Sequence, residues 1–135
     1  MRPDERLTAI PVQDATLDTG NVRPLLHELQ HALAALIESG TEHAIDLRSL
    51  PLTAAEEARL FALLGTGEVH ATVATLGNSE VVETAVAGVW RITHYNEQGD
   101  IIGKHLEVTG CPTLLKTPPE DLADGAQHLQ SLLNN

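Results

Sequence analysis

The spacing of leucines predicts a first amphipathic helix over residues 23–39. Apolar side chains recur there every three or four positions, at Leu25, Leu26, Leu29, Leu33, Leu36 and Ile37. Asn21 suits the capping position, Pro24 suits the first turn, and Gly40 ends the helix. The sequence before it is polar and mixed, so we expect residues 1–20 to form an irregular N-terminal arm.

A second helix is expected to begin near Thr53. Thr53 and Glu56 have the spacing of a capping box, in which each side chain accepts a hydrogen bond from the other residue's backbone N–H. Gly65 and Gly67 end this helix. A short strand, residues 43–47, is expected between the two helices.

From Glu68 onward the hydrophobic period changes to two, which is the period of a β-strand. One strand is predicted from Glu68 to about Thr75. A second covers residues 82–95, and a third, residues 101–108, returns antiparallel after a loop at 96–100.

A hairpin symmetric about Gln98 would place Trp90 opposite Leu106. One apolar face would then consist of Trp90, Ile92, Leu106 and Val108. The other face would consist of Arg91, His105 and Glu107. By the same parity, we expect His94 and His105 to face opposite sides of the sheet. Glu68 and Glu83 each begin a predicted strand. Because neighbouring strands are antiparallel, we also expect these two carboxylates at opposite ends of the sheet.

A last helix, residues 120–133, is predicted after Pro118 and Pro119 break the chain. We expect it to bury Leu122, Ala126, Leu129 and Leu133. Because the strands are contiguous and hairpin-linked, the pattern favours an α+β fold. The predicted sheet is mainly antiparallel, with about four strands and about three helices packed on it. Residues 21–135 would form a single domain.

Charge and hydropathy narrow the partners that we expect. The formal net charge is −11, which repels nucleic acid and anionic lipid and suits a basic or neutral protein partner. No apolar run is long enough to cross a bilayer. The opening residues lack the basic, apolar and small-residue layout of a signal peptide. We therefore expect a cytoplasmic protein without membrane insertion.

Residues 27–31 read His-Glu-Leu-Gln-His, the pattern of the zinc-protease helix. With Leu29 at the centre of the apolar stripe, His27 and His31 lie about 160° and 200° away, on the exposed line of the helix. A protease would also need a third ligand and a covering subdomain. We predict no catalytic residues and no cofactor, and we keep metal binding by His27 and His31 as the weak alternative.

Trp90 and Cys111 are the only tryptophan and the only cysteine of the chain. Trp90 is either a core anchor or a partner-binding hot spot beside Arg91. Gly88 lies on the same strand face by parity, and it lets the ring or a partner backbone approach closely. Cys111 is either a small buried hydrophobe or a thiol that contacts a partner.

Several short segments together point to a known family. They are residues 45–52, Leu63-Leu64-Gly65 with Gly67-Glu68-Val69, Glu83-Thr84 with Gly88-Val89-Trp90-Arg91, and Pro112 with Leu115. These segments resemble the C-terminal-type domain of the hydrogenase expression/formation proteins, the HupH/HyaF family. The resemblance covers residues 41–133 and is most specific around Glu83 and Trp90.

The resemblance implies a non-enzymatic assembly factor, or chaperone, for a nickel–iron hydrogenase, with the hydrogenase small subunit as its partner. Carried over residue by residue, the partner-binding surface would comprise Glu68, Glu83, Thr84, Gly88, Trp90 and Arg91. Family proteins are usually longer than this chain, so a homodimer is also considered. The alternatives are a metal-handling protein that uses surface histidines and a generic protein-binding module.

Overall fold

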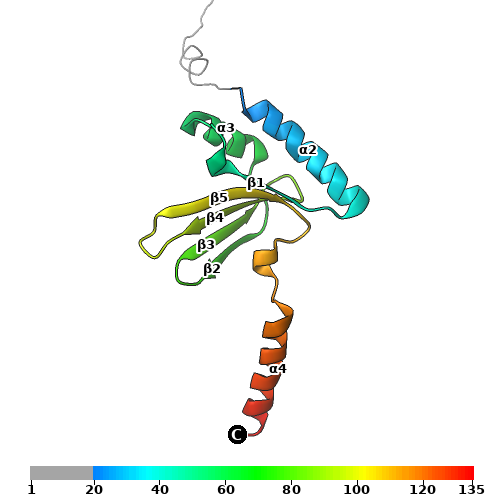
Figure 1. Ribbon diagram of the computed structural model, residues 1–135, viewed down its shortest axis with the longest axis vertical. Coiled ribbons are helices and arrows are strands. Elements are labelled where there is room, and N and C mark those ends of the chain that lie inside the picture. The colour runs from blue at the N-terminus through cyan, green and yellow to red at the C-terminus, as the bar shows by residue number, and fades with distance from the viewer. Residues whose placement is uncertain (1–19) are drawn as a thin grey trace, which may run out of the picture.

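The computed structural model describes residues 20–135, which form an antiparallel sheet of five strands and three α-helices (Figure 1). The elements are α2 (Val22–Ser39), β1 (His43–Asp46), the 3₁₀ helix η1 (Leu47–Ser49), α3 (Ala54–Leu64), β2 (His70–Ala74), β3 (Asn78–Glu83), β4 (Val89–Tyr95), β5 (Ile101–Val108), the 3₁₀ helix η2 (Thr113–Leu115) and α4 (Pro119–Leu133). The predicted α+β fold is confirmed, with five strands instead of about four. The predicted N-terminal arm lies outside the described residues, apart from Gly20.

The first two helices begin and end close to where the sequence predicts. In the capping box of α3, the Thr53 hydroxyl accepts from the Glu56 N–H, and the Glu56 carboxylate accepts from the Thr53 N–H, both at 3.1 Å. The same carboxylate lies 3.4 Å from the Asn21 N–H and is only 1% exposed. Glu56 therefore joins the start of α3 to the start of α2. Gly40 ends α2 in the left-handed conformation.

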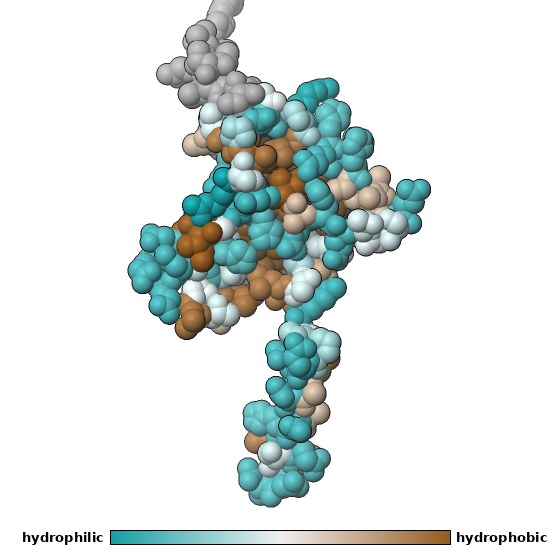
Figure 2. All heavy atoms as spheres, in the orientation of Figure 1, coloured by the Kyte–Doolittle hydropathy of each residue, from teal (hydrophilic) through white to brown (hydrophobic). Residues whose placement is uncertain are grey.

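The main core lies between these two helices and the sheet. Its buried members are Val22, Leu25, Leu29, Ala32, Ile45, Leu47, Leu60, Leu64, Val89, Leu106 and Val108. Full burial of a Leu or Val side chain contributes about 1.5–3 kcal/mol each. In the space-filling view, hydrophobic side chains gather in the body of the molecule around these elements (Figure 2).

The predicted long strand over residues 82–95 is interrupted by a turn at residues 84–88: residues 82–83 are the end of β3, which begins at Asn78, and residues 89–95 form β4. The Thr84 hydroxyl closes this turn, because it donates to the Val89 carbonyl at 2.8 Å and accepts from the Val86 N–H at 3.1 Å. The strand order in the sheet is β1-β5-β4-β3-β2. Apolar residues continue through the turn without proline or Asn-Gly, so the hydrophobic pattern alone does not reveal it.

The predicted register of the β4–β5 hairpin is wrong by one residue. Trp90 pairs with Glu107, and Arg91 pairs with Leu106. The cause is an irregularity between His94 and Tyr95, where the pairing changes by one residue. Because side chains alternate along a strand, this shift reverses the face of every residue on one strand relative to the other.

The face opposite the helices therefore carries a different set of residues from the predicted one. Trp90 and Ile92 point away from α2 and α3 and pack with Val81 on the opposite face of the sheet. Leu106 and Val108 belong to the core beneath the helices. The prediction that His94 and His105 lie on opposite faces is also wrong.

The predicted burial of the last helix is wrong as well. None of the residues of α4 is buried, and Figure 1 shows α4 extending away from the sheet and from the other two helices. Amphipathic spacing shows which side of a helix is apolar, but it does not say which surface covers that side. Within residues 20–135, no helix is both long and apolar enough to cross a membrane.

Replacing Gly77 should destabilise the sheet. Gly77 lies between β2 and β3, and an added Cβ would overlap the Tyr95 carbonyl oxygen. We expect Gly77→Ala to lower the free energy of unfolding by about 1–3 kcal/mol in urea titrations, as overpacking does. Gly110→Ala is the matched control, because a Cβ there meets nothing within 4 Å. Equal losses in the two variants would contradict this account of Gly77.

Candidate functional site

One end of the sheet brings together most of the residues that the sequence singles out. The β3–β4 turn, the connection from α3 to β2, the connection from α2 to β1 and the chain after β5 all meet there, because neighbouring strands run in opposite directions. We call this region the Trp90 end. It comprises Glu42, Glu68, Glu83, Thr84, Gly88, Trp90, Glu107, Thr109 and Cys111.

Trp90 is the buried anchor of this end. It is 6% exposed, and its indole N–H donates to the Thr109 carbonyl at 3.0 Å. Leu115 from η2 packs against the small cluster that Trp90 forms with Val81 and Ile92. Trp90 therefore joins the start of β4 to the segment that follows β5, and its place matches the core-anchor interpretation.

Arg91 points to the opposite face of the sheet. Its guanidinium carbon lies 3.9 Å from the centroid of the Phe61 ring on α3, which is cation–π geometry. Trp90 and Arg91 therefore do not share one exposed patch, although they are neighbours in the sequence. Their role in partner binding stays a prediction.

Glu68 and Glu83 lie side by side, which corrects the expectation that they sit at opposite ends. Glu83 ends β3, and its carboxylate accepts from the Glu68 backbone N–H at 3.2 Å. Gly67 permits this contact, because its N–H donates to the Glu83 carbonyl at 2.7 Å and a Cβ there would lie 2.6 Å from the Thr84 carbonyl oxygen. The error follows from the missed turn, which converts one expected strand into two.

Thr84 and Gly88 shape the turn from within. Thr84 is buried, while Gly88 adopts a φ of 90° and lies against Leu33 of α2. The Gly88 carbonyl also accepts from the Thr109 N–H at 2.9 Å. These contacts hold the turn against α2 and β5. The roles of Thr84 and Gly88 in partner binding stay predictions.

Cys111 is half-buried beside the same hydrogen-bond network. Its N–H donates to the Thr109 hydroxyl at 3.2 Å, and that hydroxyl contacts the Glu42 carboxylate at 2.5 Å. A hollow of about 220 Å³ opens next to Glu42, Glu107 and Thr109. A thiol contact between Cys111 and a partner stays a prediction.

Carboxylates dominate the electrostatics of the Trp90 end. The acidic side chains there are Glu42, Glu68, Glu83 and Glu107. Arg91, the cation nearest in sequence to Trp90, is turned toward Phe61 on the other face. Such a grouping attracts positively charged side chains over distances of about 10 Å at moderate salt.

A line of polar side chains lies on the same face of the sheet, and the sequence pattern did not predict it. The Ser79 hydroxyl lies 2.7 Å from His94 Nδ1, the rings of His94 and His105 stack with centroids 5.5 Å apart, and His105 Nε2 lies 2.9 Å from the Glu107 carboxylate. Only the one-residue change in register brings the two histidines together. The sequence signal that could have found it is Gly103, an isolated glycine within β5 that pairs with His94 at the irregularity. The line connects β3, β4 and β5 and ends at the Trp90 end.

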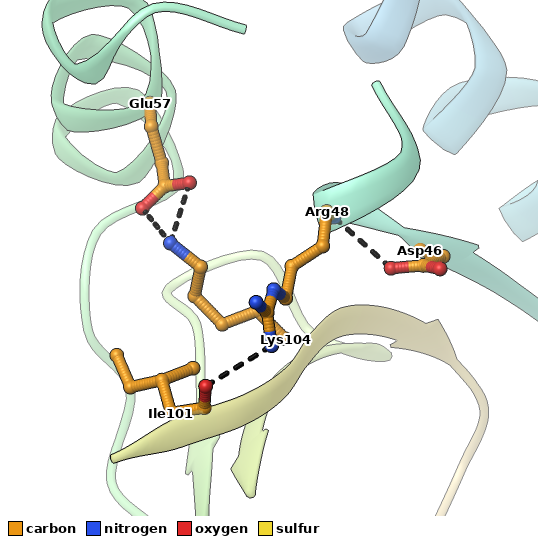
Figure 3. A network of polar contacts seen from close by, with 5 residues as sticks. All are labelled: Asp46, Arg48, Glu57, Ile101 and Lys104. Carbon is orange, nitrogen blue, oxygen red and sulfur yellow. Dashed lines mark hydrogen bonds and ion pairs between the residues drawn. The ribbon is translucent and has the colours of Figure 1, made fainter. Parts of the chain in front are cut away.

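A second polar network lies on the helix side of the sheet (Figure 3). The Lys104 ammonium lies 2.8 Å and 2.6 Å from the two carboxylate oxygens of Glu57, and Arg48 donates to the Ile101 carbonyl at 3.0 Å. The Asp46 carboxylate accepts from the Arg48 N–H at 3.0 Å. These contacts hold α3 and η1 against β5. Two of the eight Lys and Arg residues of the chain, Arg48 and Lys104, therefore lie away from the Trp90 end.

The His-Glu-Leu-Gln-His pattern is exposed on α2, as the helical spacing predicts. His27 and His31 are on the surface, and the Glu28 carboxylate lies 2.8 Å from His43 Nε2 on β1. Across residues 20–135, no group of three or more His, Cys, Asp or Glu side chains is arranged to hold a metal ion.

The α+β domain with its anchored acidic end corresponds to a described class of proteins. The family model of the HupH hydrogenase expression protein, C-terminal conserved region, matches residues 19–135. The chain therefore belongs to the HupH family, and the resemblance in the sequence is confirmed.

Individual relatives agree with this assignment. The hydrogenase expression/formation protein HupQ of Azotobacter chroococcum mcd 1 is 35% identical over 126 residues, which cover 90% of this chain and 44% of the relative. The hydrogenase-1 operon protein HyaF of Escherichia coli K12 is 29% identical, covering 83% of this chain and 39% of the relative. The chain thus spans less than half the length of the curated relatives that it matches.

A solved structure is similar over most of the chain. The hydrogenase expression protein HupH from Thiobacillus denitrificans ATCC 25259 matches with a TM-score of 0.83 and 40% sequence identity. The match covers 86% of this chain and 97% of that one. The fold is therefore shared with nearly the whole of that solved chain.

Trp90 and Arg91 should differ sharply in their effect on stability. Trp90→Phe leaves the Thr109 carbonyl without its buried donor, so we expect a loss of about 1–3 kcal/mol in the free energy of unfolding. Arg91→Leu removes a partly exposed cation–π contact and should cost about 0.5–1 kcal/mol. Circular dichroism in urea measures both, because Trp90→Phe removes the only tryptophan. A larger loss for Arg91→Leu would contradict the assigned anchor role of Trp90.

Proposed function

We propose that this chain is a non-enzymatic assembly factor, or chaperone, for a nickel–iron hydrogenase, acting in the cytoplasm and binding the hydrogenase small subunit. The observation that carries the proposal is the family match over residues 19–135, together with relatives named hydrogenase expression/formation proteins. The choice of the small subunit follows what the HupH/HyaF resemblance implies.

The Trp90 end is the surface that we assign to the partner. Its carboxylates suit a basic segment of the small subunit, and Glu68 at its rim is exposed. The buried side chains beneath it, Trp90 and Thr84, fix the backbone that carries those carboxylates. In this proposal Glu68 and Glu83 contact the partner, while Trp90, Thr84 and Gly88 act as positioning residues.

Binding through carboxylates at the rim has a physical signature. Charges at the rim of an interface mainly raise the association rate, and salt screens them. Capture of the partner should therefore weaken as the salt concentration rises. The fold of the chain itself should be far less sensitive, because its core is aliphatic.

Co-purification with the small-subunit precursor from the same cell tests the proposal. The wild-type chain should capture the precursor, and Glu68→Lys should weaken capture by roughly fivefold, which corresponds to about 1 kcal/mol. Glu97→Lys is the matched control, because it makes the same charge change at an exposed site in the β4–β5 loop, at the other end of the sheet.

Each other outcome points away from part of the proposal. Failure of the folded wild-type chain to capture a precursor that is present in the cell would contradict the chaperone role. Preferential capture of the large subunit would overturn the assigned partner. Equal losses for Glu68→Lys and Glu97→Lys would remove the Trp90 end as the binding surface.

A further inference from the structure

The helix α4 presents an apolar stripe to solvent. Its leucines Leu122, Leu129, Leu132 and Leu133 are 62%, 64%, 54% and 79% exposed, and none of its residues is buried. We propose that α4 pairs antiparallel with the α4 of a second copy of the chain, so that the two helices form a homodimer. This inference does not depend on the proposed function.

An uncovered helix of this length and composition is unstable alone. Isolated helices shorter than about 12–15 residues are marginal in water, and α4 has 15 residues. Gly125 in its interior costs about 1 kcal/mol relative to alanine. Pro118, at the N-cap, makes no side-chain capping bond. The helix therefore needs a packing surface for its apolar side.

The spacing of the apolar stripe fits a second copy of the same helix. Leu122, Ala126, Leu129 and Leu133 follow one another at intervals of four, three and four residues. This is the a/d spacing of a coiled coil, and the four side chains fall within about 60° of the helix surface.

The order of intervals reads the same in both directions, so a two-fold axis can relate two antiparallel copies. Leu122 would then meet Leu133 of the second copy, and Ala126 would meet its Leu129. A small residue opposite a large one lets the two helices approach closely at the centre. Gly125, beside Ala126, has no side chain and therefore also permits close approach of the two helices.

Charge selects the antiparallel arrangement over the parallel one. The acidic residues of α4 are Glu120, Asp121 and Asp124, all in its first two turns. Residues 125–135 contain no Asp, Glu, Lys or Arg. A parallel pair would place three carboxylates against three others, whereas an antiparallel pair places each acidic end beside an uncharged half. For a chain with a net charge of −11, this difference matters.

Two short helices bury less than the roughly 1,200 Å² of a stable protein interface, so the dimer should dissociate on dilution. Sedimentation analysis of the full chain should give a mass near 14.5 kDa at about 1 μM and approach twice that value near 100 μM. A mass of one chain throughout this range would overturn the proposal.

A pair of substitutions locates the contact on the helix surface. Leu129→Glu places a carboxylate at the centre of the stripe and should abolish the dimer. Gln127→Glu adds the same charge about 160° around the helix, so it should leave the dimer unchanged. Equal loss of the dimer in both variants would contradict the stripe as the interface.

Cross-linking determines the direction of the helices. In a Cys111→Ser background, Leu122→Cys mixed with Leu133→Cys should form an intermolecular disulfide, and neither variant should do so alone. Disulfide formation within either single variant would indicate parallel helices and overturn the arrangement.

Two further outcomes would assign the stripe to another surface. If the chain is monomeric and Leu129→Glu abolishes capture of a hydrogenase subunit, the stripe binds that subunit. If the chain is monomeric and Leu129→Glu lowers the free energy of unfolding, the stripe packs on the chain's own body. Either result would overturn the homodimer.

Discussion

The pairing of β4 with β5 decides which side chains the protein buries and which it presents. The irregularity between His94 and Tyr95 sets that pairing, and a shift of one residue would exchange the two faces of a strand. In the observed register, Leu106 and Val108 lie beneath the helices, while Trp90 faces the chain that follows β5. The aliphatic core and the Trp90 end are therefore two results of one hydrogen-bonding pattern.

The two faces of the sheet are held by different forces. On the helix side, leucines and valines provide most of the stability, and polar contacts such as Lys104 with Glu57 fix the position of α3. On the other side, the hydrophobic cluster is small, and hydrogen bonds made by Trp90 and Thr109 connect the β3–β4 turn, the α2–β1 connection and the segment after β5. A surface carried by connected loops keeps its shape when a partner approaches, which suits a binding role.

Local signals made much of the fold predictable from the sequence. Leucine spacing and the capping box at Thr53 identify α2 and α3, and the hairpin-linked strands indicate an antiparallel sheet. The turn closed by Thr84 was not predictable, because residues 84–88 contain neither proline nor an Asn-Gly pair and apolar residues continue through them. The irregularity at His94 was missed, although the isolated glycine opposite it in β5, Gly103, is a signal of such a site. The turn brings Glu68 beside Glu83, and the irregularity puts His94 and His105 on one face of the sheet. Several residues that the sequence singles out do meet at one end of the sheet, but the sequence predicted neither which of them are neighbours nor which are exposed. For α4, the leucine spacing shows an apolar side, but the expectation that this side packs on the chain's own sheet was wrong.

The position of Trp90 also makes the protein its own optical reporter. A chain with one tryptophan has one indole emitter, and here the emitter is buried at the junction of β4 with the segment after β5. The wavelength and intensity of its fluorescence depend on the polarity around the ring and on the hydrogen bond of the indole N–H. Events at this end of the sheet therefore change the intrinsic emission of the unmodified protein, whereas changes confined to α4 leave it nearly constant.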